Sequence, residues 1–146
     1  DKRQLFELCL LTYSQQSQQV LAMTLLNEKM ATFDAIRQFL HVVLIVPNND
    51  VSVLGCLLVN SIAETSKAND ELHAIAVELM QPVRLGFIHQ LGRVFDENNS
   101  KHHGEWLFTQ LLGWRLQCQM GLEKEVLERQ IIWSLSILEH EFSAQV

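Results

Sequence analysis

Apolar residues recur every three to four positions along most of the 146-residue chain, which is the spacing of one face of an α-helix. The pattern predicts about seven helices of roughly 12 to 20 residues, joined by connections near the ~2–8 residues that are usual between packed helices. No segment shows a convincing strand or a strand–helix–strand order. The sequence therefore predicts an all-α fold.

The N-terminal part of the chain predicts helices separated by polar joints. A first helix is expected over 2–13, and the Gln- and Ser-rich stretch 14–19 is interpreted as a helix start or a helical turn before a short amphipathic piece. A further helix is expected over 31–46. Its last residues, 42–46, could alone form a strand, but their continuity with the helical pattern favours a helix. Pro47 and the polar residues after it end this element, because proline cannot continue a helix.

The middle of the chain predicts a buried helix and then a segment that contains a proline. Residues 51–64 are apolar on nearly every side, which is typical of a central helix packed by neighbours on several faces. Asn69 or Asp70 is a suitable N-cap for the next helix. Its apolar stripe continues past Pro82 as far as Phe95, so this segment forms either two helices or one kinked helix.

Two strong amphipathic patterns close the chain. The polar segment 96–103, with Ser100 as an N-cap, predicts a loop, and helices are expected over 105–120 and 122–142 with Gly121 as the turn between them. One face of the last helix carries Leu127, Ile131, Leu135, Leu138 and Phe142, with Val126, Trp133 and Ile137 beside it. The chain is interpreted as a single α-helical domain over 1–146, and its start at Asp1 rather than Met predicts a segment of a longer protein.

The run Ile131-Ile132-Trp133-Ser134-Leu135-Ser136 resembles the third helix of an armadillo repeat, in which an apolar–Trp–small–Leu–Ser pattern is common. A less similar run, Val53-Leu54-Gly55-Cys56-Leu57, lies 78 residues upstream, consistent with two periods of about 39. The resemblance implies antiparallel helical hairpins in a HEAT- or armadillo-like stack; a compact helical bundle is the alternative. Members that bind extended peptides usually carry Asn four residues after the Trp, where this chain has Ile137, so the resemblance implies no peptide-binding residues.

Composition and charge narrow the class of protein. A hydrophobic content of 48%, with 6 Gly and 2 Pro, excludes a disordered or low-complexity chain. The net charge of −6 argues against nucleic-acid binding, which relies on Lys and Arg to neutralise phosphates. The longest apolar stretch, 39–46, is far shorter than the ~20 residues that span a bilayer, so no membrane contact is expected. Cys9, Cys56 and Cys118 lack any ligand spacing and predict reduced thiols in an intracellular protein, cytoplasmic or nuclear.

Motif spacing argues against an enzyme. None of the 6 His residues lies four positions from another, as a helical metal site needs. No nucleophile elbow and no Gly-rich phosphate loop occurs. The carboxylate pairs Glu123/Glu125 and Glu139/Glu141 fall at helix ends or faces, where solvation is the ordinary explanation. We therefore expect no catalytic residue, no metal and no cofactor.

A protein-binding surface remains. Trp106 lies beside the polar segment and off the apolar stripe of its helix, and Trp and Arg are enriched where interfaces bind most strongly. The candidate partner-binding residues are Trp106, Arg93, Arg115, Arg84 and His103. The alternative interpretation places Trp114 and Trp133 in the core and Trp106 in half-buried packing.

The sequence thus predicts a non-enzymatic interaction or scaffold domain. It would bind a partner helix or peptide, or associate with itself, through an apolar helical face. An obligate subunit or a homodimerisation domain of a larger regulatory complex would show the same apolar excess. Binding of nucleic acid through the segment 101–103 with Arg84 and Arg93 is disfavoured by the net charge.

Overall fold

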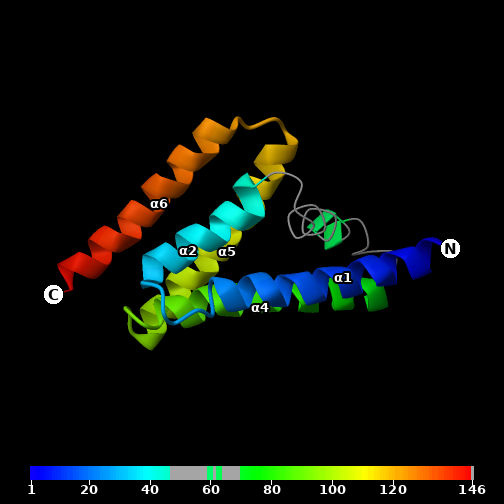
Figure 1. The fold of residues 1–146 in the computed structure, drawn as a ribbon, viewed down its shortest axis with the longest axis horizontal. Helices are drawn as coiled ribbons and strands as arrows, with labels where there is room; N and C mark the ends of the chain where they lie inside the picture. The colour runs from blue at the N-terminus through cyan, green and yellow to red at the C-terminus, as the bar shows by residue number, and fades with distance from the viewer. Residues whose placement is uncertain (47–58, 61, 64–69, 146) are drawn as a thin grey trace.

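A computed structural model describes residues 1–46, 59–60, 62–63 and 70–145 of the chain. The elements in this part are α1 (Lys2–Met23), α2 (Thr32–Leu40), the π-helical turn η1 (His41–Ile45), α4 (Asp70–Leu91), α5 (Glu97–Gln119) and α6 (Lys124–Ala144) (Figure 1). All the regular structure described is helical, which confirms the all-α fold. The described part contains five α-helices, whereas about seven were expected for the whole chain. Most of the helix expected over 51–64, and the N-cap candidate Asn69, lie outside the described residues.

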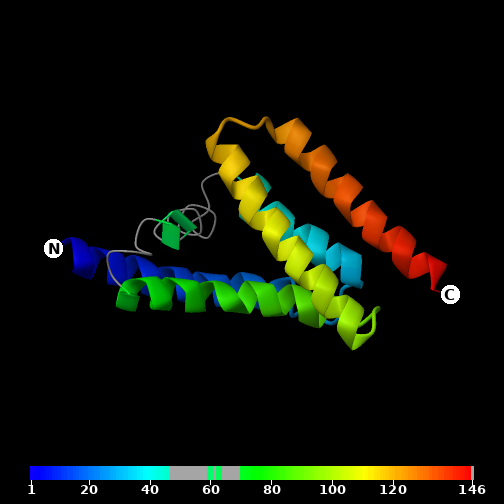
Figure 2. The ribbon, with the colours of Figure 1, turned by 180° about the vertical axis from the view of Figure 1, so that it is seen from behind.

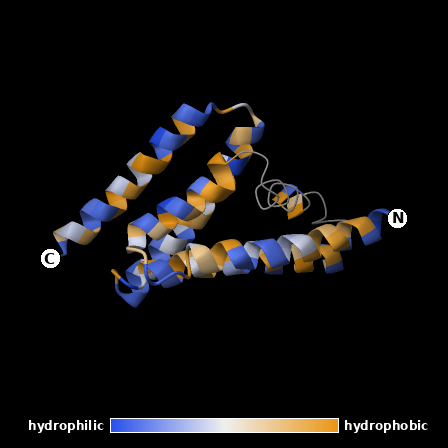
Figure 3. Cartoon of the chain, in the orientation of Figure 1, coloured by the Kyte–Doolittle hydropathy of each residue, from blue (hydrophilic) through white to orange (hydrophobic). Residues whose placement is uncertain are grey.

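The helices form two crossing groups. Helices α1 and α4 lie side by side along the long axis, and α5 crosses them at an angle in both views (Figures 1 and 2). Helix α6 returns antiparallel to α5 after the turn at Gly121. The two chain ends lie at opposite ends of the molecule (Figure 1). Hydrophobic and hydrophilic residues alternate along every helix, as expected for helices that each bury one face (Figure 3).

One main core cluster draws residues from all five α-helices. Its fully buried centre includes Phe87 of α4, whose ring meets that of Phe39 edge to face at 5.4 Å between centroids. The C-terminal end of α6 joins this cluster through Phe142. Its ring centroid lies 6.1 Å from that of Phe95 and 6.3 Å from that of Phe33. A smaller cluster between α1 and α4 contains Leu10, Tyr13, Ala76 and Met80. The α6 stripe predicted from sequence, Leu127, Ile131, Leu135 and Leu138, is buried as expected.

Two predicted interruptions do not divide the helices. The Gln- and Ser-rich stretch lies inside α1, because the buried positions Tyr13, Ser17 and Leu21 continue one stripe at four-residue spacing. Pro82 lies inside the single helix α4, with Met80 and Val83 buried on either side of it. Packing of these side chains stabilises helix where the local signals favour a break. The lower helix count follows partly from the continuity of α1, whereas for the Pro82 segment the structure decides for one helix.

The loop predicted over 96–103 is wrong, because α5 begins at Glu97. Asp96 is the N-cap: its Oδ1 accepts a hydrogen bond from the backbone N–H of Asn99 at 2.8 Å. Its Oδ2 accepts a second from the Asn99 side chain at 3.0 Å, and its carbonyl accepts the N–H of Ser100. This cap satisfies N–H groups that the first helical turn leaves unpaired, so polar residues begin a helix here.

Two glycines of the C-terminal half have defined geometric roles. Gly121 adopts φ 94°, and the N–H groups of Gly121 and Leu122 bond the carbonyls of Cys118 and Gln117, which is a Schellman motif and confirms the predicted turn. Gly104 lies where α5 crosses α4: a Cβ there would lie 2.5 Å from the Ile88 side chain and 2.9 Å from its backbone nitrogen. The absence of a side chain therefore permits the close approach of the two helices.

Candidate protein-binding surface

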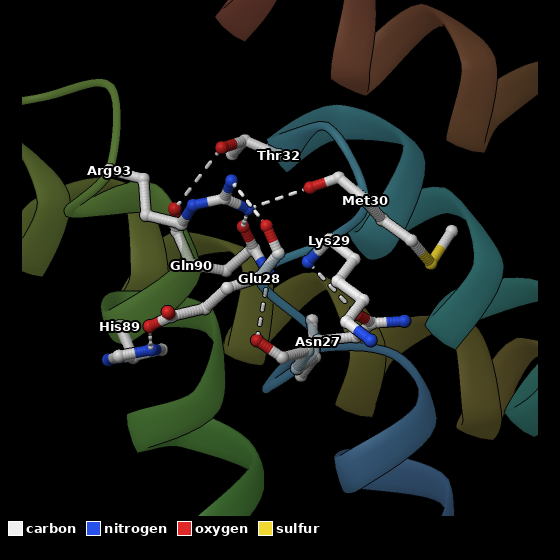
Figure 4. Close-up of polar contacts among 9 residues, drawn as sticks. Asn27, Glu28, Lys29, Met30, Thr32, His89, Gln90 and Arg93 are labelled. Carbon is white, nitrogen blue, oxygen red and sulfur yellow. Dashed lines mark hydrogen bonds and ion pairs between the residues drawn. The ribbon is translucent and has the colours of Figure 1, made fainter.

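Arg93, one of the charged candidates from sequence, holds the loop between α1 and α2 onto the end of α4 (Figure 4). Its Nη1 donates to the carbonyl of Met30 at 2.8 Å and to Oε1 of Gln90 at 2.6 Å, and its Nη2 donates to the carbonyl of Glu28 at 3.0 Å. Gln90 is fully buried and donates from Nε2 to the carbonyl of Leu25 at 2.9 Å. Both side chains therefore serve the fold by pairing loop carbonyls.

Arg84 and Trp106 lie near the crossing of α4 and α5. The Arg84 guanidinium donates to Gln81 within α4 and to Oε1 of Glu105 on α5, at 2.9 and 3.1 Å. Trp106 is partly buried against the main core, in agreement with the half-buried packing that was the alternative interpretation. Arg84 therefore already forms an ion pair, with Glu105 across the contact of α4 and α5.

His103 and Arg115 lie inside the molecule. His103 is 9% exposed, its ring meets that of Phe95 at 4.9 Å between centroids, and its Nε2 lies 3.0 Å from a carboxylate oxygen of Glu141 on α6. Arg115 is 3% exposed and lies close enough to Tyr13 of α1 to influence the phenol electrostatically. The five candidate residues thus face different neighbours, and the structure does not bring them together on one surface.

Burial raises the pKa of Tyr13, against smaller opposing effects of the Arg115 charge and a hydrogen bond with Ser17. The folded protein therefore holds this proton more tightly than the unfolded chain does. The stability contributed by the neutral phenol is complete below the unfolded pKa of about 10 and is lost as the pH rises above it. Because Tyr13 is the only tyrosine, the ultraviolet absorbance of phenolate should appear at higher pH in the native protein than in urea.

Tyr13→Phe is the control for this titration. The phenolate absorbance should vanish in this variant, and its loss of stability above about pH 10 should be shallower than that of the wild type. Equal midpoints for the native and urea-unfolded wild type would contradict the effect of burial.

The three tryptophans have separate environments. Trp114 is 3% exposed and donates from Nε1 to Oε1 of Gln130 on α6 at 3.0 Å, which confirms its place in the core. Trp133 is 69% exposed, so its assignment to the core is wrong. The signal was present in the sequence: Trp133 is two positions from both Ile131 and Leu135, and at ~100° per residue this places it about 200° around the helix from either one.

Trp133 belongs to an exposed apolar surface, which we call the α6 apolar face and define as Ile132, Trp133 and Ile137. Ile132 is 56% exposed and Ile137 is 44% exposed. A second exposed row lies on α1 and consists of Leu5, Leu8 and Leu11. Leucine is under-represented among residues that dominate binding energy, whereas tryptophan is enriched, so α6 carries the stronger indication of a binding surface.

A cleft of about 200 Å³ adjoins this face, between α2 with η1 on one side and α6 on the other. It is lined by Arg37, His41, Ile45, Glu128, Ile131 and Ile132, so Ile132 belongs to both features. The π-helical turn shapes the wall. The N–H of Val46 bonds the carbonyl of His41 at 3.0 Å, and the buried residues Leu40 and Ile45 are five positions apart. The lining residues Arg37, His41 and Ile45 follow one another at four-residue spacing, so one side of α2 and η1 forms this wall.

Charged side chains bridge the two walls of the cleft. Arg37 of α2 pairs with Asp34 on its own helix, at 3.1 Å, and with Glu139 of α6. All three side chains are at least two-fifths exposed, so each pair contributes little to stability. Their effect is to set the sign of the potential around the cleft.

Other kinds of site find no support in the described part of the chain. Its side chains form no group of three or more His, Cys, Asp or Glu that could hold a metal ion. None of its helices combines the length and apolar character that crossing a membrane requires. No protein-family model, no curated protein and no solved structure matches the chain.

Proposed function

We propose that this chain is a non-enzymatic protein-interaction domain that binds its partner through the α6 apolar face. The observation that carries the proposal is the exposure of Trp133, at 69%, beside the exposed Ile132 and Ile137. Water contact with this apolar area is unfavourable by about 25 cal/mol per Å², which a partner would relieve. Aromatic anchors of this kind dominate the binding energy of many interfaces.

The absence of catalysis is part of the proposal. The described residues that line the cleft offer no Ser, Thr or Cys nucleophile. A cleft of about 200 Å³ is also smaller than the ~300–1,000 Å³ usual for small-molecule sites. The cleft is better suited to one bulky side chain of a partner than to a substrate or cofactor.

The architecture in which this face is presented is proposed as a HEAT- or armadillo-like arrangement. Support comes from the packing of α5 on α4 and of α6 on α2, and from the outward position of α6 (Figure 2). Such arrangements present exposed helix faces to protein partners. An intracellular location, cytoplasmic or nuclear, is proposed because Cys9 and Cys118 are not in disulfide bonds.

Affinity capture with wild type and variants tests the interaction. Trp133→Ala should reduce recovery of the bound partner at least about tenfold, the effect of losing a dominant anchor. The matched control is Leu116→Ala on α5: Leu116 is 56% exposed, as Ile132 is, but lies away from the α6 apolar face. It should leave recovery within about twofold, since surface substitutions outside an interface change little.

Equal recovery with wild type and Trp133→Ala would contradict the proposal. Thermal unfolding of both variants should stay close to that of the wild type, because both side chains are exposed. Light scattering of the wild type tests the remaining alternative, which is self-association through the same face. A dimer that dissociates on Trp133→Ala would assign the face to self-association, as in a homodimerisation domain or an obligate subunit.

A further inference from the structure

The cleft beside α6 is one end of a longer groove. A neighbouring hollow of about 380 Å³ is lined by Met30, Asp34, Arg37, Gln38 and His41, and it shares Arg37 and His41 with the cleft. Together they follow the outer side of α2 and η1 from the α1–α2 loop to α6; we call them the α2–α6 groove. Thr32–Ile45 spans about 21 Å at ~1.5 Å per residue, which corresponds to nearly four turns of a helix lying alongside.

The groove combines an apolar wall with an acidic rim. Ile45, Ile131 and Ile132 line the apolar end. Around them stand the carboxylates of Asp34, Glu128 and Glu139 and the guanidinium of Arg37. Because Arg37 is already paired with Asp34 and Glu139, the charge left for a partner is negative. An occupant with apolar and basic side chains complements both features.

The same groove on a second copy of this chain does not have that chemistry. Helix α6 carries four Glu against one Lys and one Arg, and the chain as a whole has a net charge of −6. A two-fold contact would place the same acidic surface on both sides, and like charges facing each other oppose association. An acidic lipid surface is disfavoured for the same reason.

We propose that the α2–α6 groove binds an amphipathic helix of a partner protein with Lys or Arg flanking its apolar stripe. A bulky apolar side chain of that helix fills the cleft against Ile45, Ile131 and Ile132. The basic side chains meet Glu128 and Glu139 at the rim of the groove. The inference rests on the proposed function, because Ile132 makes the groove and the α6 apolar face one continuous surface.

Two designed peptides of about 18 residues, long enough for five helical turns, serve as probes. They share one Leu stripe and differ only in their polar face, which is Lys in one and Glu in the other. Fluorescence anisotropy at low salt should give a dissociation constant for the Lys peptide at least about tenfold below that for the Glu peptide. Added salt should weaken binding of the Lys peptide, because screening shortens the range of the electrostatic attraction.

A matched pair of charge reversals locates the binding. Glu128→Lys should weaken binding of the Lys peptide about tenfold. Glu78→Lys, the same change at an exposed position of α4, should change its dissociation constant less than about twofold. Equal losses in both variants would show attraction to net charge alone and overturn the proposal. Equal affinity for the Lys and Glu peptides would also overturn it.

The two proposals fail separately. In one outcome, Trp133→Ala abolishes capture of the natural partner, whereas Glu128→Lys captures it fully and binds the Lys peptide as the wild type does. This result would support the interaction domain and overturn the groove as a helix-binding site. If Glu128→Lys abolishes peptide binding while Trp133→Ala captures the natural partner fully, the groove stands as a peptide site and the α6 apolar face loses its assigned function.

Discussion

Gly104→Ala is expected to lower the free energy of unfolding by about 1–3 kcal/mol, although alanine is the better helix former by about 1 kcal/mol. The new Cβ would lie 2.5 Å from a side-chain carbon of Ile88 and 2.9 and 3.0 Å from its backbone nitrogen and Cα. The last two atoms belong to the α4 backbone and cannot rotate away. Helices α4 and α5 must therefore separate, which loosens the packing around Phe87 and Leu107.

Gly113→Ala, in the same helix, is the matched control. No atom lies within 4 Å of a Cβ at this position, so only helix propensity acts, and the substitution should raise stability by about 0.5–1 kcal/mol. Urea unfolding followed by far-ultraviolet circular dichroism measures both variants, with unchanged slopes required for the comparison. Stabilisation of both variants would contradict the close crossing of α4 and α5.

Gln90→Ala is expected to lower the free energy of unfolding by about 2–4 kcal/mol. Gln90 is fully buried, and its loss leaves a small cavity, removes the donor to the carbonyl of Leu25 and removes an acceptor from Arg93. An unpaired buried polar group costs about 1–3 kcal/mol, to which the lost packing adds. The same denaturation measurement applies.

Arg93→Ala and the double variant show whether the two side chains act together. Arg93 is more exposed, so its removal should cost about 1–2 kcal/mol, and the double variant should cost less than the two single losses combined, because they share one network. Arg129→Ala, an exposed arginine of α6, should change stability by less than about 0.5 kcal/mol. Strict additivity would contradict the shared clamp on the α1–α2 loop.

Arg93 illustrates why candidate residues could not be assigned from sequence. Its partners are backbone carbonyls of Glu28 and Met30, more than sixty positions away. A carbonyl has no sequence signature, so an arginine that binds one looks the same as an arginine that awaits a partner protein. Trp133 is the opposite case, since the helical angle from Ile131 already places it on the outer side of a regular helix.

The α2–α6 groove has no comparable signal in the sequence. It depends on two segments joined by the Arg37–Glu139 pair, 102 positions apart. The periodicity of 31–46 predicted a helix correctly, but it carries no information about which distant helix packs beside that segment. The local pattern therefore predicted one wall of the groove but not the helix that faces it.

By itself the sequence determined the helical class and the buried stripe of α6, because spacing of three to four residues is a local property. It also determined the turn at Gly121, where φ 94° favours glycine. Only the tertiary structure decided that the Gln- and Ser-rich stretch and Pro82 continue helices, that Arg93, His103 and Arg115 have neighbours within the fold, and that Ile132 borders a groove. Those outcomes depend on which distant surfaces meet, and the free energy of that contact outweighs local preference.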